Sequence, residues 1–175
     1  MTKYLTHLQL KAARHALNFG VRDIAKVLRV SKATISKAEL DKTRDFFYKH
    51  GAALTSFFES NNIFFPNEYC IRYGSNTNIV EDTENILTRF QLKVARNIIG
   101  MTQYELAQII HVNKRVITEA EKLANDNQIN KQYNSIVLQL KHTFQIHDII
   151  FPDQSSIFYK KYVDKRYKEM IRLTN

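Results

Sequence analysis

Residues 21–39 read VRDIAKVLRVSKATISKAE, and this stretch decides the fold. Its apolar residues recur at the spacing of two short helices joined by a tight turn, and lysine, serine and threonine fill positions between them. Ser31 is a favourable N-cap for the second helix, because its hydroxyl can accept a hydrogen bond from the first helical turn. The stretch therefore predicts two helices. The apolar positions are Ile24, Ala25, Leu28, Val30 and Ile35.

The same pattern occurs a second time in the chain. Residues 5–39 align without a gap to residues 87–121, LTRFQLKVARNIIGMTQYELAQIIHVNKRVITEAE. After a small change of length the match resumes, because IFFPNEYCIRY (63–73) pairs with IIFPDQSSIFY (149–159). Repeats of this kind indicate a duplicated structural unit. The identical pairs include Leu5/Leu87, Thr6/Thr88, Gln9/Gln91, Lys11/Lys93, Arg14/Arg96, Ala25/Ala107, Val30/Val112, Lys32/Lys114, Ile35/Ile117 and Glu39/Glu121.

The repeat divides the chain into two units and two connecting or terminal segments. The polar, acidic stretch between the units has the composition of a linker, and the basic, aromatic C-terminal segment is treated as a tail. The tail has two interpretations, a final helix that packs on the body or an arm that lies on nucleic acid. The predicted boundaries are 1–73 and 87–159 for the units, 74–86 for the linker and 160–175 for the tail.

Capping signals fix where the helices begin. Thr6 and Gln9 form a capping box, in which the hydroxyl accepts from the third helical N–H and the glutamine reaches back; Thr88 and Gln91 repeat it. A further box and a second N-cap are predicted in the second unit, at Thr102/Glu105 and Asn113. The predicted helices cover about 8–18, 21–28 and 31–39 in the first unit, and 90–100, 103–110 and 113–121 in the second.

The remainder of each unit predicts a long fourth helix and two short strands. FFYKHGAALTSFFESN and QYNSIVLQLKHTFQIH hold apolar residues at helical spacing. IFFP and YCIRY in the first unit, and IIFP and SIFYKKY in the second, are rich in β-branched and aromatic residues, with a proline at the bend. Each unit is therefore expected to be a helical bundle that ends in a β-hairpin.

Composition agrees with a mainly helical protein that has a polyanionic partner. The 175 residues include 44 % hydrophobic residues but only 4 Gly and 2 Pro, few for an all-β chain. The net charge of +9 favours nucleic acid or an anionic membrane surface, although solubility alone is an alternative. Cys70 is the single cysteine, so no intrachain disulfide is expected. The sequence shows no secretory signal and no membrane-length apolar run, which predicts a cytoplasmic protein.

The two units resemble the DNA-binding domain of the phage-repressor (XRE/Cro-like) family. The residues that carry the resemblance are QLKVAR and TQYELAQIIHVNKRVITEAE in the second unit, and DIAKVLRVSKATISKAE in the first; SNNIFFP resembles a strand that ends the domain in some members. The resemblance implies two tandem lambda-repressor-like helix-turn-helix bundles, in each of which the third helix enters the DNA major groove. Arg29 and His111 stand where the family usually has glycine, and Val21 replaces the glutamine that opens the second helix.

Most apolar residues of the pattern are expected to form the core, and two charge pairs to be structural. The resemblance implies that Arg14 with Glu39, and Arg96 with Glu121, tie the first helix of each unit to the third; the alternative is exposed charges that never meet. The predicted core residues are Leu10, Ala13, Leu17, Ile24, Ala25, Leu28, Val30 and Ile35, and Leu92, Ala95, Ile99, Leu106, Ala107, Ile110, Val112 and Ile117.

The exposed face of each third helix is the candidate DNA-binding surface. Lys and Arg can bind guanine, Glu can accept from cytosine and Ala can contact the thymine methyl group, while hydroxyls and amides suit phosphate oxygens. Any exposed helix face can carry such residues, which is the alternative interpretation. The candidate DNA-binding residues are Ser31, Lys32, Ala33, Thr34, Ser36 and Lys37 in the first unit, and Thr102, Gln103, Asn113, Lys114, Arg115, Thr118 and Glu119 in the second.

The sequence thus predicts a transcriptional regulator that binds double-stranded DNA through two helix-turn-helix units per chain. The two units are expected to form an intramolecular pseudo-dimer joined through the terminal strands, with a homodimer as the alternative. The rival function is a protein-interaction adaptor that has lost DNA binding. The six histidines show no ligand spacing, and no catalytic set stands out, so no metal, no cofactor and no enzymatic activity are expected.

Overall fold

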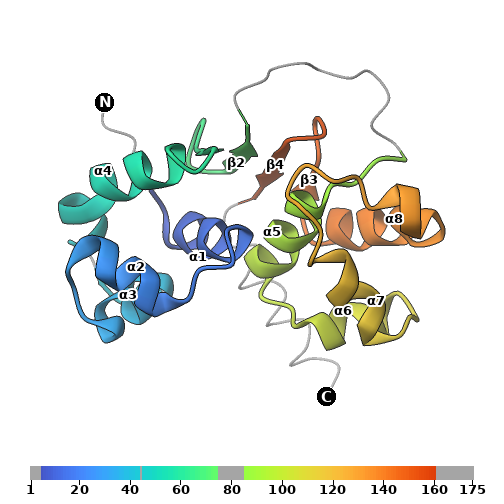
Figure 1. Ribbon diagram of the computed structural model, residues 1–175, viewed down its shortest axis with the longest axis horizontal. Coiled ribbons are helices and arrows are strands. Elements are labelled where there is room, and N and C mark those ends of the chain that lie inside the picture. Colours follow the sequence, from blue (N-terminus) through green and yellow to red (C-terminus); the bar gives the residue numbers. More distant parts are fainter. Residues whose placement is uncertain (1–4, 44, 75–84, 161–175) are drawn as a thin grey trace.

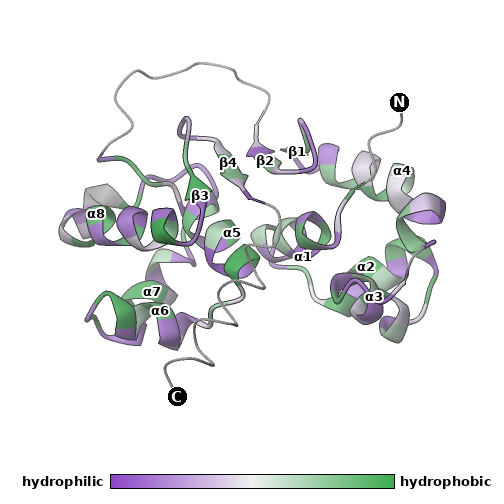
Figure 2. Ribbon diagram, turned by 180° about the vertical axis from the view of Figure 1, so that it is seen from behind, coloured by the Kyte–Doolittle hydropathy of each residue, from purple (hydrophilic) through white to green (hydrophobic). Residues whose placement is uncertain are grey.

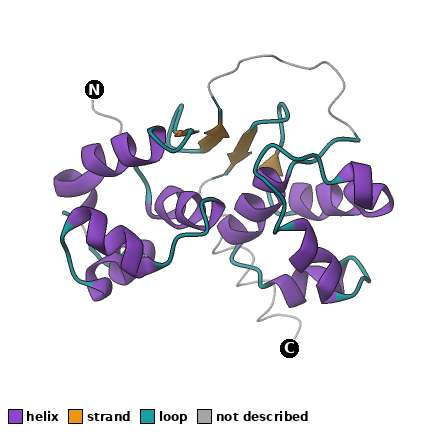
Figure 3. Cartoon of the chain, viewed as in Figure 1, coloured by secondary structure: helices purple, strands orange, loops and turns teal. Residues whose placement is uncertain are grey.

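A computed structural model describes residues 5–43, 45–74 and 85–160 of the chain. We call residues 5–74 the first half and residues 85–160 the second half. Helices make up most of the described residues, and a small antiparallel sheet completes the fold (Figure 3). Nearly all of the predicted linker (74–86) and tail (160–175) lies outside the described residues. None of the described helices is long and apolar enough to cross a bilayer.

The two halves contain the same elements in the same order. The first half consists of α1 (His7–Ala16), α2 (Val21–Leu28), α3 (Lys32–Glu39), α4 (Phe46–Glu59), β1 (Ile63–Phe64) and β2 (Cys70–Tyr73). The second half consists of α5 (Arg89–Ile99), α6 (Gln103–Ile109), α7 (Lys114–Ala120), α8 (Asn130–Ile146), β3 (Ile149–Ile150) and β4 (Ser156–Tyr159).

The predicted helix starts are confirmed by their capping contacts. Thr6 and Gln9 form the capping box of α1, and Thr88 and Gln91 form that of α5. Ser31 accepts from the backbone of Thr34 at 3.1 Å at the start of α3. The side chains of the same two glutamines also donate hydrogen bonds to backbone carbonyls of the hairpins. Gln9 Nε2 donates to the carbonyls of Asn67 and Cys70, at 2.7 and 3.0 Å, and so holds the hairpin of the first half against α1.

The core follows the predicted pattern. The predicted core residues are buried except Leu17, Leu28, Val30 and Val112, which are half-buried and pack against the core. Buried apolar side chains of both halves form one continuous cluster. The long helix α8 departs from regular geometry at Tyr133, where φ is −132° and ψ is 40°. The sequence of this helix gave no signal of the kink.

The two hairpins join in a single four-stranded sheet. β1 pairs with β2 and β3 pairs with β4, as each predicted hairpin requires, and β2 pairs with β4 across the two halves. The strand order is therefore β1-β2-β4-β3, with the two halves meeting at the centre of the sheet. Beneath the sheet, α1 packs against α5 (Figure 1). The pairs α2–α3 and α6–α7 lie on the side of α1 and α5 that faces away from the sheet (Figure 1).

Left-handed residues occur at equivalent places in both halves. Arg29 and His111, which stand where the phage-repressor family that the sequence resembles usually has glycine, have φ values of 53° and 55°. The turn therefore keeps the positive φ that glycine would provide, at a strain cost of about 1 kcal/mol per residue. Asn18, with a φ of 60°, ends the α1 region and corresponds to Gly100, with a φ of 91°. Asparagine tolerates this conformation better than most residues.

Candidate nucleic-acid interface

The α2–α3 corner presents the candidate residues of the first half. The apolar side of the corner is fixed by Ile24 and Ile35, both fully buried, and the turn is closed by a hydrogen bond from Val30 N–H to the Ala25 carbonyl at 3.0 Å. This packing turns the opposite side of α3 to solvent. Ser31, Lys32, Ala33 and Lys37 are exposed, whereas Thr34 and Ser36 are half-buried.

The α6–α7 corner presents the second set in the same way. Val112 N–H donates to the Ala107 carbonyl at 2.9 Å, and Asn113 caps α7 by accepting from the Arg115 backbone at 2.8 Å. The exposed candidate residues are Thr102, Asn113, Lys114 and Arg115, and the half-buried ones are Gln103, Thr118 and Glu119. Each half thus brings its own predicted residues together. The two sets lie on separate helix pairs, both on the side away from the sheet (Figure 1).

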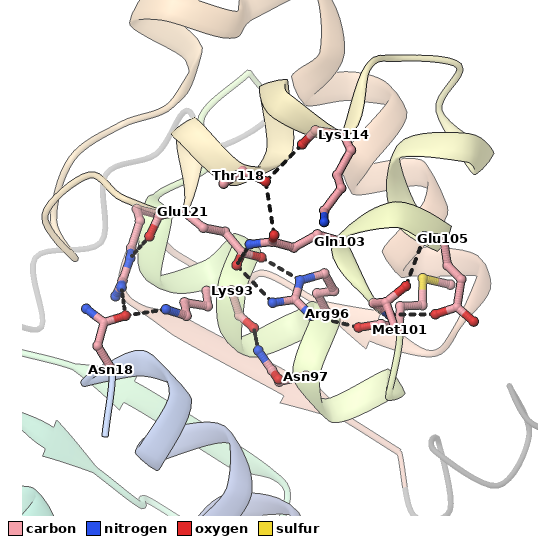
Figure 4. Close-up of polar contacts among 12 residues, drawn as sticks. Asn18, Lys93, Arg96, Asn97, Met101, Gln103, Glu105, Lys114, Thr118 and Glu121 are labelled. Atoms are coloured by element: carbon pink, nitrogen blue, oxygen red, sulfur yellow. Dashed lines mark hydrogen bonds and ion pairs between the residues drawn. The ribbon is translucent and has the colours of Figure 1, made fainter. Parts of the chain in front are cut away.

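Gln103 is held in place by two neighbours within the second half. Its Nε2 donates to Glu121 Oε2 at 2.9 Å, and its Oε1 accepts from the Thr118 hydroxyl at 3.0 Å (Figure 4). Figure 4 shows Gln103 between these two side chains, so its amide has a defined orientation. The first half has Val21 and Ser36 at the equivalent positions and lacks this network. Val21 is half-buried and packs against the core instead.

The two predicted charge pairs are in contact. Arg14 Nε and Nη2 donate to the two oxygens of Glu39 at 2.6 and 2.9 Å, and Nη1 donates to the Phe19 carbonyl at 2.8 Å. Arg96 repeats the arrangement with Glu121, at 2.5 and 2.8 Å. Such bidentate pairs fix geometry as well as charge. They tie α1 to α3 and α5 to α7, and so set the angle at which each exposed face is presented.

A third buried arginine, Arg89, links the two halves. Arg89, 2 % exposed, donates to the Glu121 carbonyl at 3.0 Å, to the Ala16 carbonyl at the end of α1 at 2.5 Å and to Asn18 Oδ1 at 2.9 Å. Lys93 also donates to Asn18 Oδ1 (Figure 4). Sequence reasoning missed this cluster, because Arg89 aligns with His7 in the repeat and therefore carries no repeated signal.

Burial shifts the pKa values of several cationic groups at the contact between α1 and α5. It lowers the pKa of His15 to about 3, with further lowering by the nearby cations Arg14 and Arg96. Burial also lowers the pKa of Lys93 to about 8. Desolvation disfavours the charged form of both groups.

An ion pair lies on the exposed side of the second half. Lys122 donates to Glu119 at 2.9 Å, and this contact lowers the pKa of the Glu119 carboxyl. Glu119 is therefore partly neutralised by its neighbour within the same half. No group of three or more His, Cys, Asp or Glu side chains that could hold a metal ion occurs in residues 5–43, 45–74 and 85–160.

Comparison with family models, with curated proteins and with solved structures found no match for this chain. The functional argument consequently depends on the geometry and chemistry of the two exposed helix faces.

Proposed function

We propose that the protein binds specific sites on double-stranded DNA and regulates transcription through two helix-turn-helix units per chain. The observation that carries the proposal is the placement of α3 and α7. Each is a short helix with an exposed polar face, and both lie on the same side of the molecule, opposite the sheet (Figure 1). A pair of such helices is the arrangement with which dimeric helix-turn-helix proteins read two half-sites.

In this proposal the exposed side chains have two roles. Lys32 and Lys37 on α3, and Lys114 and Arg115 on α7, reach base edges in the major groove, where guanine offers the acceptors that cations prefer. The N-terminal residues of α3 and α6–α7 hold phosphates through hydroxyl and amide groups. Gln103, oriented by Thr118 and Glu121, is the best-defined of these phosphate contacts.

The contact between the halves takes the place of a dimer interface. The β2–β4 pairing, the packing of α1 against α5 and the Arg89 cluster support a fixed spacing between α3 and α7. We propose that one chain acts as an intramolecular pseudo-dimer. Because α3 and α7 differ in sequence, its preferred site would be asymmetric rather than palindromic.

Selection of bound sequences from a random DNA pool tests the proposal. The expected result is an enriched asymmetric site with two recognised segments about one helical turn apart. A substitution at Lys32 should relax specificity at one segment, and a substitution at Lys114 at the other. Recovery of no enriched sequence, together with no salt-dependent affinity for duplex DNA, would contradict the proposal and favour the protein-interaction adaptor.

A further inference from the structure

The two exposed faces differ strongly in charge at equivalent positions. Five positions of the α2–α3 face carry a cation, and only one of their counterparts on the α6–α7 face does. One counterpart even reverses the sign, since Lys37 corresponds to Glu119. The equivalent pairs, taken from the ungapped repeat, are Arg22/Tyr104, Lys26/Gln108, Arg29/His111, Lys32/Lys114 and Lys37/Glu119.

Neighbouring charges narrow this difference but keep its direction, because Arg115 and Lys122 of the second half align with Ala33 and Leu40 of the first. The first face carries two exposed carboxylates among its exposed cations, and one of these, Asp23, is engaged at the helix start by accepting from Gly20 N–H at 2.8 Å. On the second face, Lys114 and Arg115 are exposed, while Lys122 donates to Glu119. The exposed cations of the first face are Arg22, Lys26, Arg29, Lys32, Lys37 and Lys42.

Hydropathy follows the same division. Figure 2 shows hydrophilic residues concentrated on α3, whereas α6 and α7 combine hydrophobic and hydrophilic residues. Tyr104, which replaces Arg22, is 58 % exposed. A tyrosine hydroxyl can bind a phosphate oxygen without releasing a counterion, so its contribution is insensitive to salt. A cation at the same place contributes to the salt-dependent part of the binding free energy.

We infer that the two halves contribute to DNA binding in different ways, a division of work between an ionic and a short-range contact surface. This inference rests on the proposed function. The α2–α3 face supplies most of the ionic attraction to the phosphate backbone and anchors the chain. The α6–α7 face contributes short-range contacts through neutral side chains and a small net charge. The half-site under α7 is then occupied because the anchored first half brings α7 to it.

Exchange of side chains between the faces tests this division. One variant gives the first face the side chains of the second, Arg22→Tyr, Lys26→Gln and Lys37→Glu. The reciprocal variant is Tyr104→Arg, Gln108→Lys and Glu119→Lys, and its change of charge is equal and opposite. The measurement is the affinity of the full chain for a fluorescent random-sequence duplex over a range of salt concentrations.

The native protein is expected to bind with a steep salt dependence. Each phosphate contact contributes a slope of about 0.9, which is about a twofold loss of affinity for each doubling of salt. The first variant should reduce the slope by about 2–3, and the reciprocal variant should raise it by a similar amount. A melting curve of each variant checks that it is folded. A gain of affinity in the reciprocal variant cannot result from unfolding, so that variant tests the inference even if the first one is destabilised.

Two single substitutions control for the overall charge. Lys37→Glu and Lys49→Glu change the net charge equally, and both lysines are exposed, but Lys49 lies on α4. Only Lys37→Glu should reduce the slope. An equal effect of the two, or an unchanged slope in the first exchange variant, would overturn the division of work while the DNA binding of the native protein still supported the proposed function. Absence of salt-dependent binding by the native protein would overturn both.

Discussion

Ile71 of β2 lies directly opposite Ile157 of β4 at the centre of the sheet. The two residues are equivalent in the repeat, so each half contributes the same position to the strand pair that joins the halves. Cys70 faces Phe158 and Arg72 faces Ser156, and these pairs are also exchanged by the repeat. The strand pairing therefore has the character of a two-fold interface formed within one chain.

Loss of one of these isoleucines should weaken the junction. Both side chains are fully buried, so Ile157→Ala is expected to lower the free energy of unfolding by about 2–5 kcal/mol. Because the two side chains lie opposite each other, Ile71→Ala and Ile157→Ala should be non-additive by roughly 0.5–3 kcal/mol. Denaturant unfolding of both single variants and the double variant measures this coupling. Strict additivity would show that the pair is not a structural unit.

The buried charge pairs predict a graded loss of stability. Glu121→Gln should cost about 3–5 kcal/mol, because it leaves the Arg96 guanidinium buried without its counter-charge. Glu39→Gln should cost less, since the Glu39 side chain is 10 % exposed against 2 % for Glu121, and only Glu121 also accepts from Gln103. Thermal unfolding of the two variants gives the order.

The exposed pair on α7 provides the control for these variants. Glu119→Gln removes a carboxylate that bonds only with Lys122 at the surface, so its melting temperature should equal that of the native protein. A larger loss for Glu39→Gln than for Glu121→Gln would contradict the assignment of Glu121 as the more deeply buried partner.

The repeat explains why some of these features could be predicted from the sequence. Thr6 with Gln9, and Ser31, depend on local spacing, so pattern reasoning identified them. The Arg14–Glu39 pairing is implied by the resemblance to the phage-repressor family. Arg89 and Asn18 make contacts across the halves, and neither has an identical partner in the other copy. Contacts that break the symmetry of a duplication leave no periodic or repeated signal, which is why this cluster required the structure.

Arg89 predicts a stability contribution that its counterpart His7 lacks. Arg89→Met keeps much of the side-chain length but leaves the Ala16 carbonyl without this donor and Asn18 Oδ1 with Lys93 alone, so unfolding should become easier by about 3 kcal/mol. Asn18→Gly is a milder test, because glycine keeps the φ of 60° and removes only the side-chain acceptor. Denaturant midpoints of both variants measure the effect. No change in the midpoint for Arg89→Met would show that the Arg89 cluster does not stabilise the fold.

His15 predicts a pH dependence with a defined sign. Its pKa falls from the ordinary value of 6.5 to about 3 in the folded chain, chiefly through burial. Between these values the unfolded chain binds the proton and the folded chain does not, so stability decreases as the pH falls from 6.5 toward 3. His15→Asn, which copies Asn97 of the second half, should remove this contribution. The difference in melting temperature between variant and native protein should therefore increase in favour of the variant from pH 7 to pH 5. A constant difference across this range would contradict the assignment to His15.

Substitutions at the two left-handed turn residues, Arg29 and His111, distinguish the effect of backbone strain on stability from the effect of charge on DNA affinity. Arg29 and His111 both hold φ near +55°, so Arg29→Gly and His111→Gly should each stabilise the fold by about 0.5–1 kcal/mol. Only the first substitution removes a permanent cation from a proposed DNA-binding face, since histidine lacks the fixed charge of arginine. Arg29→Gly should therefore gain stability and lose affinity for duplex DNA at low salt. His111→Gly should gain stability with little change in affinity.

Melting temperature and DNA affinity are measured for both glycine variants, which gives four results to compare with these expectations. Equal losses of affinity would mean that turn geometry, not the Arg29 charge, controls binding. Loss of stability in both variants would mean that the side chains of Arg29 and His111 make contacts that outweigh the strain of positive φ. His111→Val serves as the opposite control, because a β-branched residue disfavours positive φ and should destabilise the α6–α7 turn.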